Sequence, residues 1–346
     1  MASEDTLSPL PGNVAVRERL AALSDAGRLH PCLLFEGPGG VGKFEAARWL
    51  AAYTNCDADE GVPRPCGTCW SCRRIRDGNH PDVLHVGLDP ERKAPIISVA
   101  QARQLIGQLV LRPYNARRRF ILIDPADAMN PAAANALLKT FEEPPDDTGF
   151  ILITSQPTAL LQTVRSRSQR VRFGPVGEDL LVPWLEARGV EEGRLAARRA
   201  DGCPKRALSL SEGEGREREE ALDAILSALG GSIDGVFRYS QSLTRGDRAA
   251  WTRRAALTLG ALDELTRDAW LVTAGLPLSR AYHADRGGLV RKWGDALERE
   301  GLVEVQRLIA TARADLERFV NGRLVFDTLL TGIAKQLGRQ RGTLTA

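Results

Sequence analysis

Hydrophobic residues in the first half of the chain form short continuous runs, separated by segments with helical spacing. The runs cover residues 31–36, 120–124 and 150–154, and the helical segments cover 44–53 and 132–141. Continuous apolar runs of this length are typical of strands buried on both faces, with helices packed above and below them. The pattern over residues 14–173 therefore predicts an α/β fold, with a mainly parallel sheet covered by helices on both faces.

The pattern changes after residue 175. Residues 178–210 predict a few short helices, and the polar stretch 211–217 predicts a linker. Residues 218–340 show amphipathic helical spacing, for example over 302–320, and no clear strand. We therefore predict three domains: an α/β domain over residues 1–174, a small helical domain over 175–212, and an all-helical domain over 213–346.

Composition and charge restrict the class of protein. Hydrophobic residues make up 43% and charged residues 26%, and the net charge is +3, which excludes a histone-like polycation. Glu4 and Asp5 lie in an N-terminal segment without an apolar run, so we expect no signal peptide. No segment approaches the roughly 18–20 apolar residues that cross a bilayer, so we expect no membrane contact and a cytoplasmic location.

Four of the six cysteines are closely spaced, as C-x9-C-x2-C-x2-C. Thiols stay reduced in the cytoplasm, and Zn²⁺ prefers a tetrahedron of thiolates that such short spacings can supply. We predict a closed structural zinc site within residues 56–72, and we interpret His80 as a bystander. The alternatives are four unrelated thiols or redox chemistry of paired cysteines. Cys32 and Cys203 are expected to be buried thiols. The predicted zinc ligands are Cys56, Cys66, Cys69 and Cys72.

A glycine-rich loop follows the first apolar run and precedes a helical segment. Gly37, Gly39, Gly42 and Lys43 fit G-x-x-x-x-G-K, in which backbone N–H groups and the lysine hold a phosphate. The next residue is Phe44, where a phosphate loop needs Ser or Thr to bind Mg²⁺. ATP binding is therefore doubtful. Passive nucleotide or phosphate binding and a retained turn without a ligand remain alternatives.

The end of the predicted strand over residues 120–124 would also take part in ATP hydrolysis. Asp124 closes the run 120–124 and could hold a metal ion, but Pro125 takes the place of the glutamate that activates water in ATPases. Asp127 lies two residues too late for that task. Without a metal hydroxyl ligand and a base, we expect hydrolysis to fall by several orders of magnitude.

These segments together resemble the clamp-loader branch of the AAA+ family. Residues 124–127 and 130–145, ending Ala-Asn-Ala-Leu-Leu-Lys-Thr-Phe-Glu-Glu-Pro-Pro, are similar to its D-E-A-D and A-N-A-L-L-K-T-L-E-E-P-P motifs. Residues 163–168 are similar to its S-R-C motif, with Ser168 at the Cys position. The resemblance covers residues 12–210 and implies an AAA+ fold with a zinc module. It also implies a lid over 175–212 and a C-terminal domain for oligomerisation.

The resemblance also implies roles for single residues. Thr154, with Ser155, lies at the sensor-1 position, where a polar group contacts the γ-phosphate, and Lys205 lies at the sensor-2 position. Arg167 lies at the position of an arginine finger, which would act on the ATP of a neighbouring subunit. The alternative for Arg167 is a solvated surface charge.

Because Phe44 and Pro125 replace catalytic residues, the resemblance favours a non-catalytic member of a DNA polymerase III clamp loader. The implied partners are gamma/tau-type ATPase and delta subunits, the sliding clamp, and primer–template DNA reached through the complex. The alternatives are a catalytically active AAA+ ATPase subunit and a stand-alone zinc-dependent DNA-binding protein. Four clustered arginines could face DNA phosphates, or could belong to a solvated loop; they are Arg112, Arg117, Arg118 and Arg119.

Overall fold

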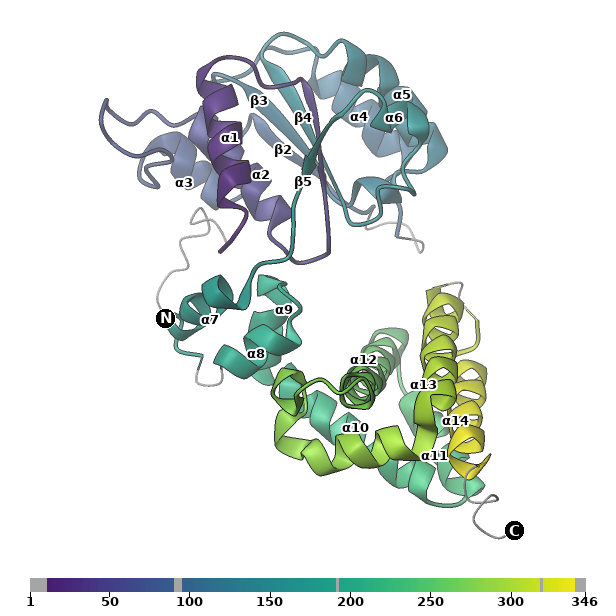
Figure 1. Cartoon of the computed structure of the whole chain (residues 1–346). Coiled ribbons are helices and arrows are strands. Elements are labelled where there is room, and N and C mark those ends of the chain that lie inside the picture. The colour runs from purple at the N-terminus through teal and green to yellow at the C-terminus, as the bar shows by residue number, and fades with distance from the viewer. Residues whose placement is uncertain (1–10, 90–94, 191–192, 318–319, 340–346) are drawn as a thin grey trace. The chain divides into compact units, whose positions relative to one another are not determined.

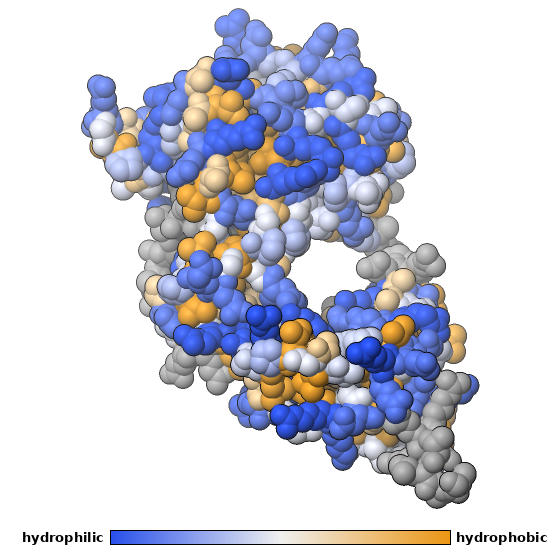
Figure 2. Space-filling view, viewed as in Figure 1, coloured by the Kyte–Doolittle hydropathy of each residue, from blue (hydrophilic) through white to orange (hydrophobic). Residues whose placement is uncertain are grey.

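The computed structural model describes residues 11–89, 95–190, 193–317 and 320–339. The chain divides into two compact units, Met1–Leu208 and Ser209–Ala346, which Figure 1 shows as an α/β part and a helical part. Among the described residues, no helix has both the length and the apolar character needed to span a membrane. The visible face is largely hydrophilic, with small apolar areas on both units (Figure 2).

The first unit is built on a five-stranded parallel sheet with the order β2-β3-β4-β1-β5. The three strands predicted from apolar runs form its centre, and the two that sequence analysis missed form its edges. β2 and β5 are short and mix polar with apolar residues, which explains why periodicity did not detect them. The strands are β1 (Cys32–Glu36), β2 (Val83–Val86), β3 (Arg119–Ile123), β4 (Thr148–Thr154) and β5 (Gln169–Arg172).

Helices cover both faces of this sheet, as predicted. Alternate strand residues point to opposite faces, so Leu33 and Phe35 pack with the first three helices while Cys32 and Leu34 pack with the next three. Figure 1 shows the two helical layers on either side of the strands. The first layer is α1 (Val14–Asp25), α2 (Lys43–Thr54) and α3 (Trp70–Arg76); the second is α4 (Val99–Gln108), α5 (Pro131–Glu142) and α6 (Gln162–Arg165), with the 3-10 turn η1 (Ala126–Ala128) before α5.

Two helices of the second layer begin at strong capping residues. The Ser98 side chain accepts a hydrogen bond from the Gln101 backbone, and the Gln101 side chain returns one to the Ser98 backbone, which is a capping box at the start of α4. The Asn130 side chain accepts from the Ala133 N–H at the start of α5. These caps fix where α4 and α5 begin relative to the sheet.

Three short helices follow the sheet and have a small apolar core of their own. Leu181, Leu185 and Ala197 are among its buried residues. This confirms the prediction of short helices over residues 178–210. The helices are α7 (Glu178–Glu186), α8 (Gly193–Arg199) and α9 (Pro204–Ser209).

The second unit contains helices joined by short connections and no strand among its described residues, as predicted. Its core is formed by residues such as Leu262, Phe326 and Ile333. The helix α13 is broken at Glu298, where φ is 50° and ψ is −172°. The main helices are α10 (Gly215–Gly230), α11 (Ile233–Leu243), α12 (Arg248–Thr273), α13 (Gly287–Glu317) and α14 (Gly322–Arg339), with short turns η3 (Leu278–Arg280) and η4 (Ala284–Arg286).

The predicted linker over residues 211–217 is wrong in one respect. This stretch is helical: the π-helical turn η2 (Leu210–Glu214) leads directly into α10. The turn is interrupted at Gly213, where φ is 112°, a conformation that glycine adopts without steric cost. A polar composition does not exclude a helix, because Glu and Arg are both good helix formers.

Candidate functional site

The glycine-rich loop joins β1 to α2 at the carboxyl end of the sheet. Gly37 has a φ of 148°, and a Cβ built on it would lie 2.1 Å from the carbonyl oxygen of Phe173. The position therefore requires glycine. Gly42 has a φ of 93° and forms the N-cap of α2, so the loop has the strand-to-helix form predicted from the sequence.

Lys43 is turned back onto this loop. Its Nζ donates hydrogen bonds to the carbonyl oxygens of Gly37 at 2.7 Å and Pro38 at 2.5 Å, and the residue is 6% exposed. Burial lowers the pKa of Lys43 from its ordinary value, and the nearby Asp124 carboxylate opposes that shift. A phosphate that entered the loop would have to compete with these two carbonyl groups for the ammonium.

Phe44 points from the start of α2 toward the edge strand β2. Its ring packs against the imidazole of His85 with centroids 4.9 Å apart and planes tilted by 60°. The half-buried Phe44 ring, packed on the exposed His85, therefore stands where a phosphate loop would present a hydroxyl group to Mg²⁺. The aromatic pair offers no oxygen ligand, and hard divalent cations require oxygen ligands.

The second strand end holds two aspartates that differ in their contacts. Burial raises the pKa of Asp124, while His85 and Lys43 act to lower it. Asp127 accepts a hydrogen bond from the hydroxyl of Thr154, and the same hydroxyl oxygen accepts one from the Gln156 N–H at 2.9 Å. Thr154, the predicted sensor-1 residue, is thus engaged within the chain at the end of β4.

The start of α9 lies against the glycine-rich loop. The Lys205 N–H donates to the Gly40 carbonyl at 3.3 Å, and the Cys203 thiol donates to the Gly39 carbonyl at 3.0 Å. Burial raises the pKa of the Cys203 thiol. Cys203 is only partly buried, unlike the fully buried Cys32, so the prediction of two buried thiols is right for one of them.

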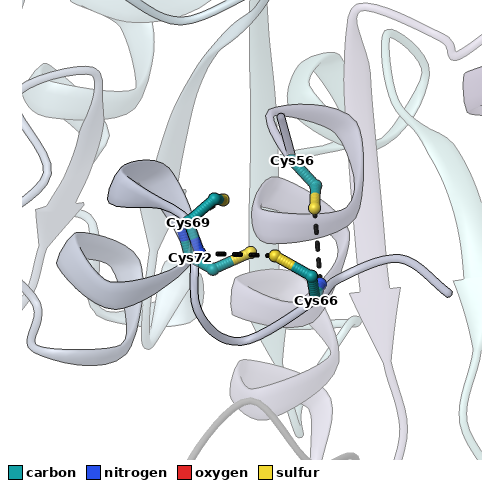
Figure 3. Close-up of side chains that lie close together, drawn as sticks. All are labelled: Cys56, Cys66, Cys69 and Cys72. Carbon is teal, nitrogen blue, oxygen red and sulfur yellow. Dashed lines mark hydrogen bonds between the residues drawn. The ribbon is translucent and has the colours of Figure 1, made fainter. Parts of the chain in front are cut away.

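The four clustered cysteines converge at the start of α3 (Figure 3). Their sulfur atoms all lie within 4.8 Å of one another. A tetrahedral zinc–thiolate site places sulfurs about 3.8 Å apart, because each Zn–S bond is about 2.3 Å long. The donor set therefore fits one tetrahedral metal ion after a small contraction. His80 is not in this cluster, in agreement with its interpretation as a bystander.

Backbone N–H groups near the cluster donate to three of its sulfur atoms, while burial raises the pKa of Cys56 and of Cys72. The N–H of Cys66 donates to the Cys56 sulfur at 3.3 Å, that of Cys69 donates to the Cys66 sulfur at 3.3 Å, and that of Cys72 donates to the Cys69 sulfur at 3.4 Å. Burial acts to raise the pKa of Cys66, but hydrogen bonds from Thr68 and neighbouring N–H groups outweigh it and lower the pKa to about 6. Thiolates are the form that binds metal ions.

Arg167 lies on the turn between α6 and β5. Its Nε donates to the Glu142 carboxylate, and its Nη1 donates to the Thr163 carbonyl at 3.0 Å. Ser168, the next residue, donates its hydroxyl hydrogen to the Val164 carbonyl at 2.8 Å and so fixes the turn. The Arg167 side chain is 34% exposed, which leaves its guanidinium accessible to an external anion.

Residues 12–177 match the family model described as DNA polymerase III, delta subunit. Subunit delta' of DNA polymerase III from Escherichia coli K12 is 35% identical over 213 residues, which are 61% of this chain and 63% of that protein. Subunit delta' from Bacillus subtilis 168 is 42% identical over 149 residues, 43% of this chain and 44% of that protein. Over this region the chain is clamp-loader delta-prime-like.

Subunit tau of DNA polymerase III from Escherichia coli K12 is also similar, with 32% identity over 238 residues. These residues are 65% of this chain and 36% of the tau protein. The chain thus spans less than two thirds of the length of each of these relatives. The chain is thus similar over this region both to delta' and to tau subunits of DNA polymerase III, and these similarities do not separate a catalytic from a non-catalytic member.

The arginine cluster of this delta-prime-like chain does not form a single basic face. Arg119 is 7% exposed and lies 3.5 Å from the Asp82 carboxylate, while two of its nitrogens donate to backbone carbonyls. Arg118 is partly buried and donates to the Leu29 carbonyl at 3.3 Å. Only Arg112 and Arg117 are exposed. The hypothesis that all four arginines face DNA is therefore wrong, because two of them are used to hold the fold together.

Sequence reasoning did not single out two residues that the geometry makes important. Glu142 was part of a recognised motif without a role of its own, and Asp82 was not noticed at all. Asp82 is buried and accepts hydrogen bonds from three consecutive backbone N–H groups. The Glu-Glu-Pro-Pro sequence was a usable signal for Glu142, since prolines at 144 and 145 end the helix there.

Proposed function

We propose that this chain is a non-catalytic delta-prime subunit of a DNA polymerase III clamp loader. It assembles with gamma/tau-type ATPase and delta subunits through its helical domain over residues 213–346, and residues 175–212 serve as the lid beside the glycine-rich loop. The complex loads the sliding clamp onto primer–template DNA. The chain contributes Arg167 to the ATP site of a neighbouring subunit and hydrolyses no ATP itself.

The observation that carries this proposal is the state of the glycine-rich loop. Lys43 is bonded to two carbonyls of the loop, and Phe44 packs on His85 in place of a metal-binding hydroxyl. Pro125 follows Asp124, so the strand end lacks a second carboxylate at the position that would orient water. Phosphoryl transfer depends almost wholly on such positioning and on metal-borne charge, so losing both halves removes the chemistry.

Arg167 supports the other half of the proposal. Its side chain is partly exposed, and two hydrogen bonds hold its guanidinium in place. A planar guanidinium can bind two phosphoryl oxygens at once and neutralise the charge that develops during transfer. Since the chain's own loop lacks the groups for hydrolysis, an arginine that acts on ATP must act on a neighbour's ATP.

The cysteine cluster would hold one Zn²⁺ through Cys56, Cys66, Cys69 and Cys72. A four-thiolate site leaves no open coordination position, so the ion would tie the segment after α2 to the start of α3 and take no part in chemistry. This role fits the backbone N–H groups directed at the sulfurs.

The alternative function is an active clamp-loader ATPase, which the similarity to subunit tau favours. ATP hydrolysis by the purified chain separates the two. We expect turnover at background level, unchanged by Lys43→Ala. Hydrolysis above background that Lys43→Ala abolishes would establish the alternative and refute the non-catalytic assignment.

A further inference from the structure

Glu142 is the last residue of α5, and its carboxylate accepts a hydrogen bond from the Nε of Arg167. Figure 1 shows α5 and α6 next to each other on the same side of the sheet, so the end of one helix meets the turn after the other. Asn130 caps the start of α5, and two prolines directly after Glu143 end it. Both ends of α5 are therefore defined, and this fixes the position of Glu142 at its end.

Two contacts within the chain occupy two of the N–H donors of the Arg167 guanidinium. Arginine has five N–H donors in a planar fork. Glu142 takes the Nε donor, and the Thr163 carbonyl takes one donor of Nη1. The other three donors remain for an external ligand, which is enough to bind two oxygens of a phosphoryl group.

We propose that Glu142 is a positioning residue, which holds Arg167 in the orientation that a neighbouring subunit's ATP requires. The inference rests on the proposed function, because it assumes that Arg167 acts in trans. Glu142 is 45% exposed and does not touch the phosphate; it acts through Arg167. A long side chain that is ordered before the neighbour docks loses less conformational freedom when it binds.

The test uses the reconstituted clamp loader with Glu142→Ala, Glu142→Gln and Glu143→Ala. Ordering one long side chain is worth about two- to tenfold in rate, so Glu142→Ala should lower kcat for ATP hydrolysis by that factor. Glu142→Gln should keep most of the rate, since its amide oxygen can still accept from Nε. Glu143→Ala is the matched control: Glu143 is the exposed neighbour at the end of α5, and its removal should change nothing.

A second set of variants separates this inference from the proposed function. In an Arg167→Ala background, Glu142→Ala should have no further effect on kcat, whereas a merely structural role would lower the rate in both backgrounds. If Arg167→Ala leaves the rate unchanged, the trans role itself fails. If Arg167→Ala lowers the rate but Glu142→Ala does not, or raises it, the positioning role of Glu142 is wrong.

Discussion

The buried carboxylate of Asp82 gives the sharpest prediction about the stability of the α/β unit. Its oxygens accept from the backbone N–H groups of Tyr114 at 2.8 Å, Asn115 at 2.9 Å and Ala116 at 3.1 Å, and Arg119 lies at 3.5 Å. The Asp82 and Arg119 side chains are 1% and 7% exposed. The Asp82 carboxylate therefore anchors the loop before β3 and compensates the buried positive charge of Arg119.

Asp82→Asn keeps the size of the side chain but removes its charge and one acceptor oxygen. The amide NH₂ of asparagine cannot accept, so in either orientation it would oppose two of the donors that the carboxylate oxygens serve. Arg119 would keep its backbone carbonyl partners but lose the only negative charge that the structure places beside it within the described residues. Breaking a buried pair by removing one partner costs about 3–5 kcal/mol. Since domains are stable by about 5–15 kcal/mol, we expect a large loss of the free energy of unfolding.

Native-state hydrogen exchange at the Tyr114, Asn115 and Ala116 amides measures this effect in the unit itself. The matched control is Asp57→Asn, since Asp57 lies 3.6 Å from Arg117 with both side chains more than half exposed. An exposed pair of this kind is worth about 0–1 kcal/mol. If Asp82→Asn lowered the free energy of opening by no more than Asp57→Asn, the argument from burial would be refuted.

The same carboxylate predicts how stability depends on pH. Burial acts to raise the pKa of Asp82, but the three backbone hydrogen bonds and Arg119 outweigh it, so the pKa lies below its ordinary value of 3.8. A lowered pKa means that the carboxylate stabilises the fold above the ordinary value and that this contribution is lost as pH falls through the lower folded value. The stability difference between wild type and Asp82→Asn should thus be full at neutral pH and shrink below pH 3.8.

Two further predictions concern the loops at the candidate sites. Elemental analysis of the folded chain should find about one Zn²⁺ per chain, and Cys66→Ser should reduce it whereas the control Cys203→Ser should not; equal zinc in both variants would show that the cluster is not the metal site. Gly37→Ala should lower the free energy of unfolding by about 2 kcal/mol or more in chemical denaturation, because its Cβ would lie 2.1 Å from the Phe173 oxygen. Gly39→Ala, with nothing within 4 Å of its Cβ, should be nearly neutral, and equal losses in the two would contradict this reading.

Local sequence signals predicted the centre of the α/β unit well. Continuous apolar runs identified β1, β3 and β4, since buried parallel strands are apolar on both faces. The close spacing of four cysteines predicted that their sulfurs would meet, and the structure brings them together. The edge strands β2 and β5 were missed because both are short and mix polar with apolar residues, so neither forms a continuous apolar run.

The arrangement of charged groups could not be predicted in the same way. Arg119 and Arg117 are similar in local sequence, yet one is buried beside Asp82 and the other is exposed. The difference depends on contacts between residues more than thirty positions apart. Likewise, the sequence contains Lys43 at the position of a phosphate ligand, but only the folded loop reveals that two of its own carbonyls hold the ammonium.

The central claim is that Arg167 acts on the ATP of a neighbouring subunit. The most direct test measures ATP hydrolysis and clamp loading by a reconstituted complex that carries Arg167→Ala. We expect normal folding and zinc content, because the hydrogen bonds of the Arg167 side chain go to the exposed Glu142 and to the exposed Thr163 four residues earlier. Clamp loading should fall at least about tenfold, since a finger contributes about 10³–10⁵ in rate at the site it serves. Arg167→Lys should fail as well, because an ammonium lacks the planar fork, whereas Arg28→Ala, which removes another exposed arginine, should load clamps normally. Wild-type rates of hydrolysis and loading with Arg167→Ala would contradict the account.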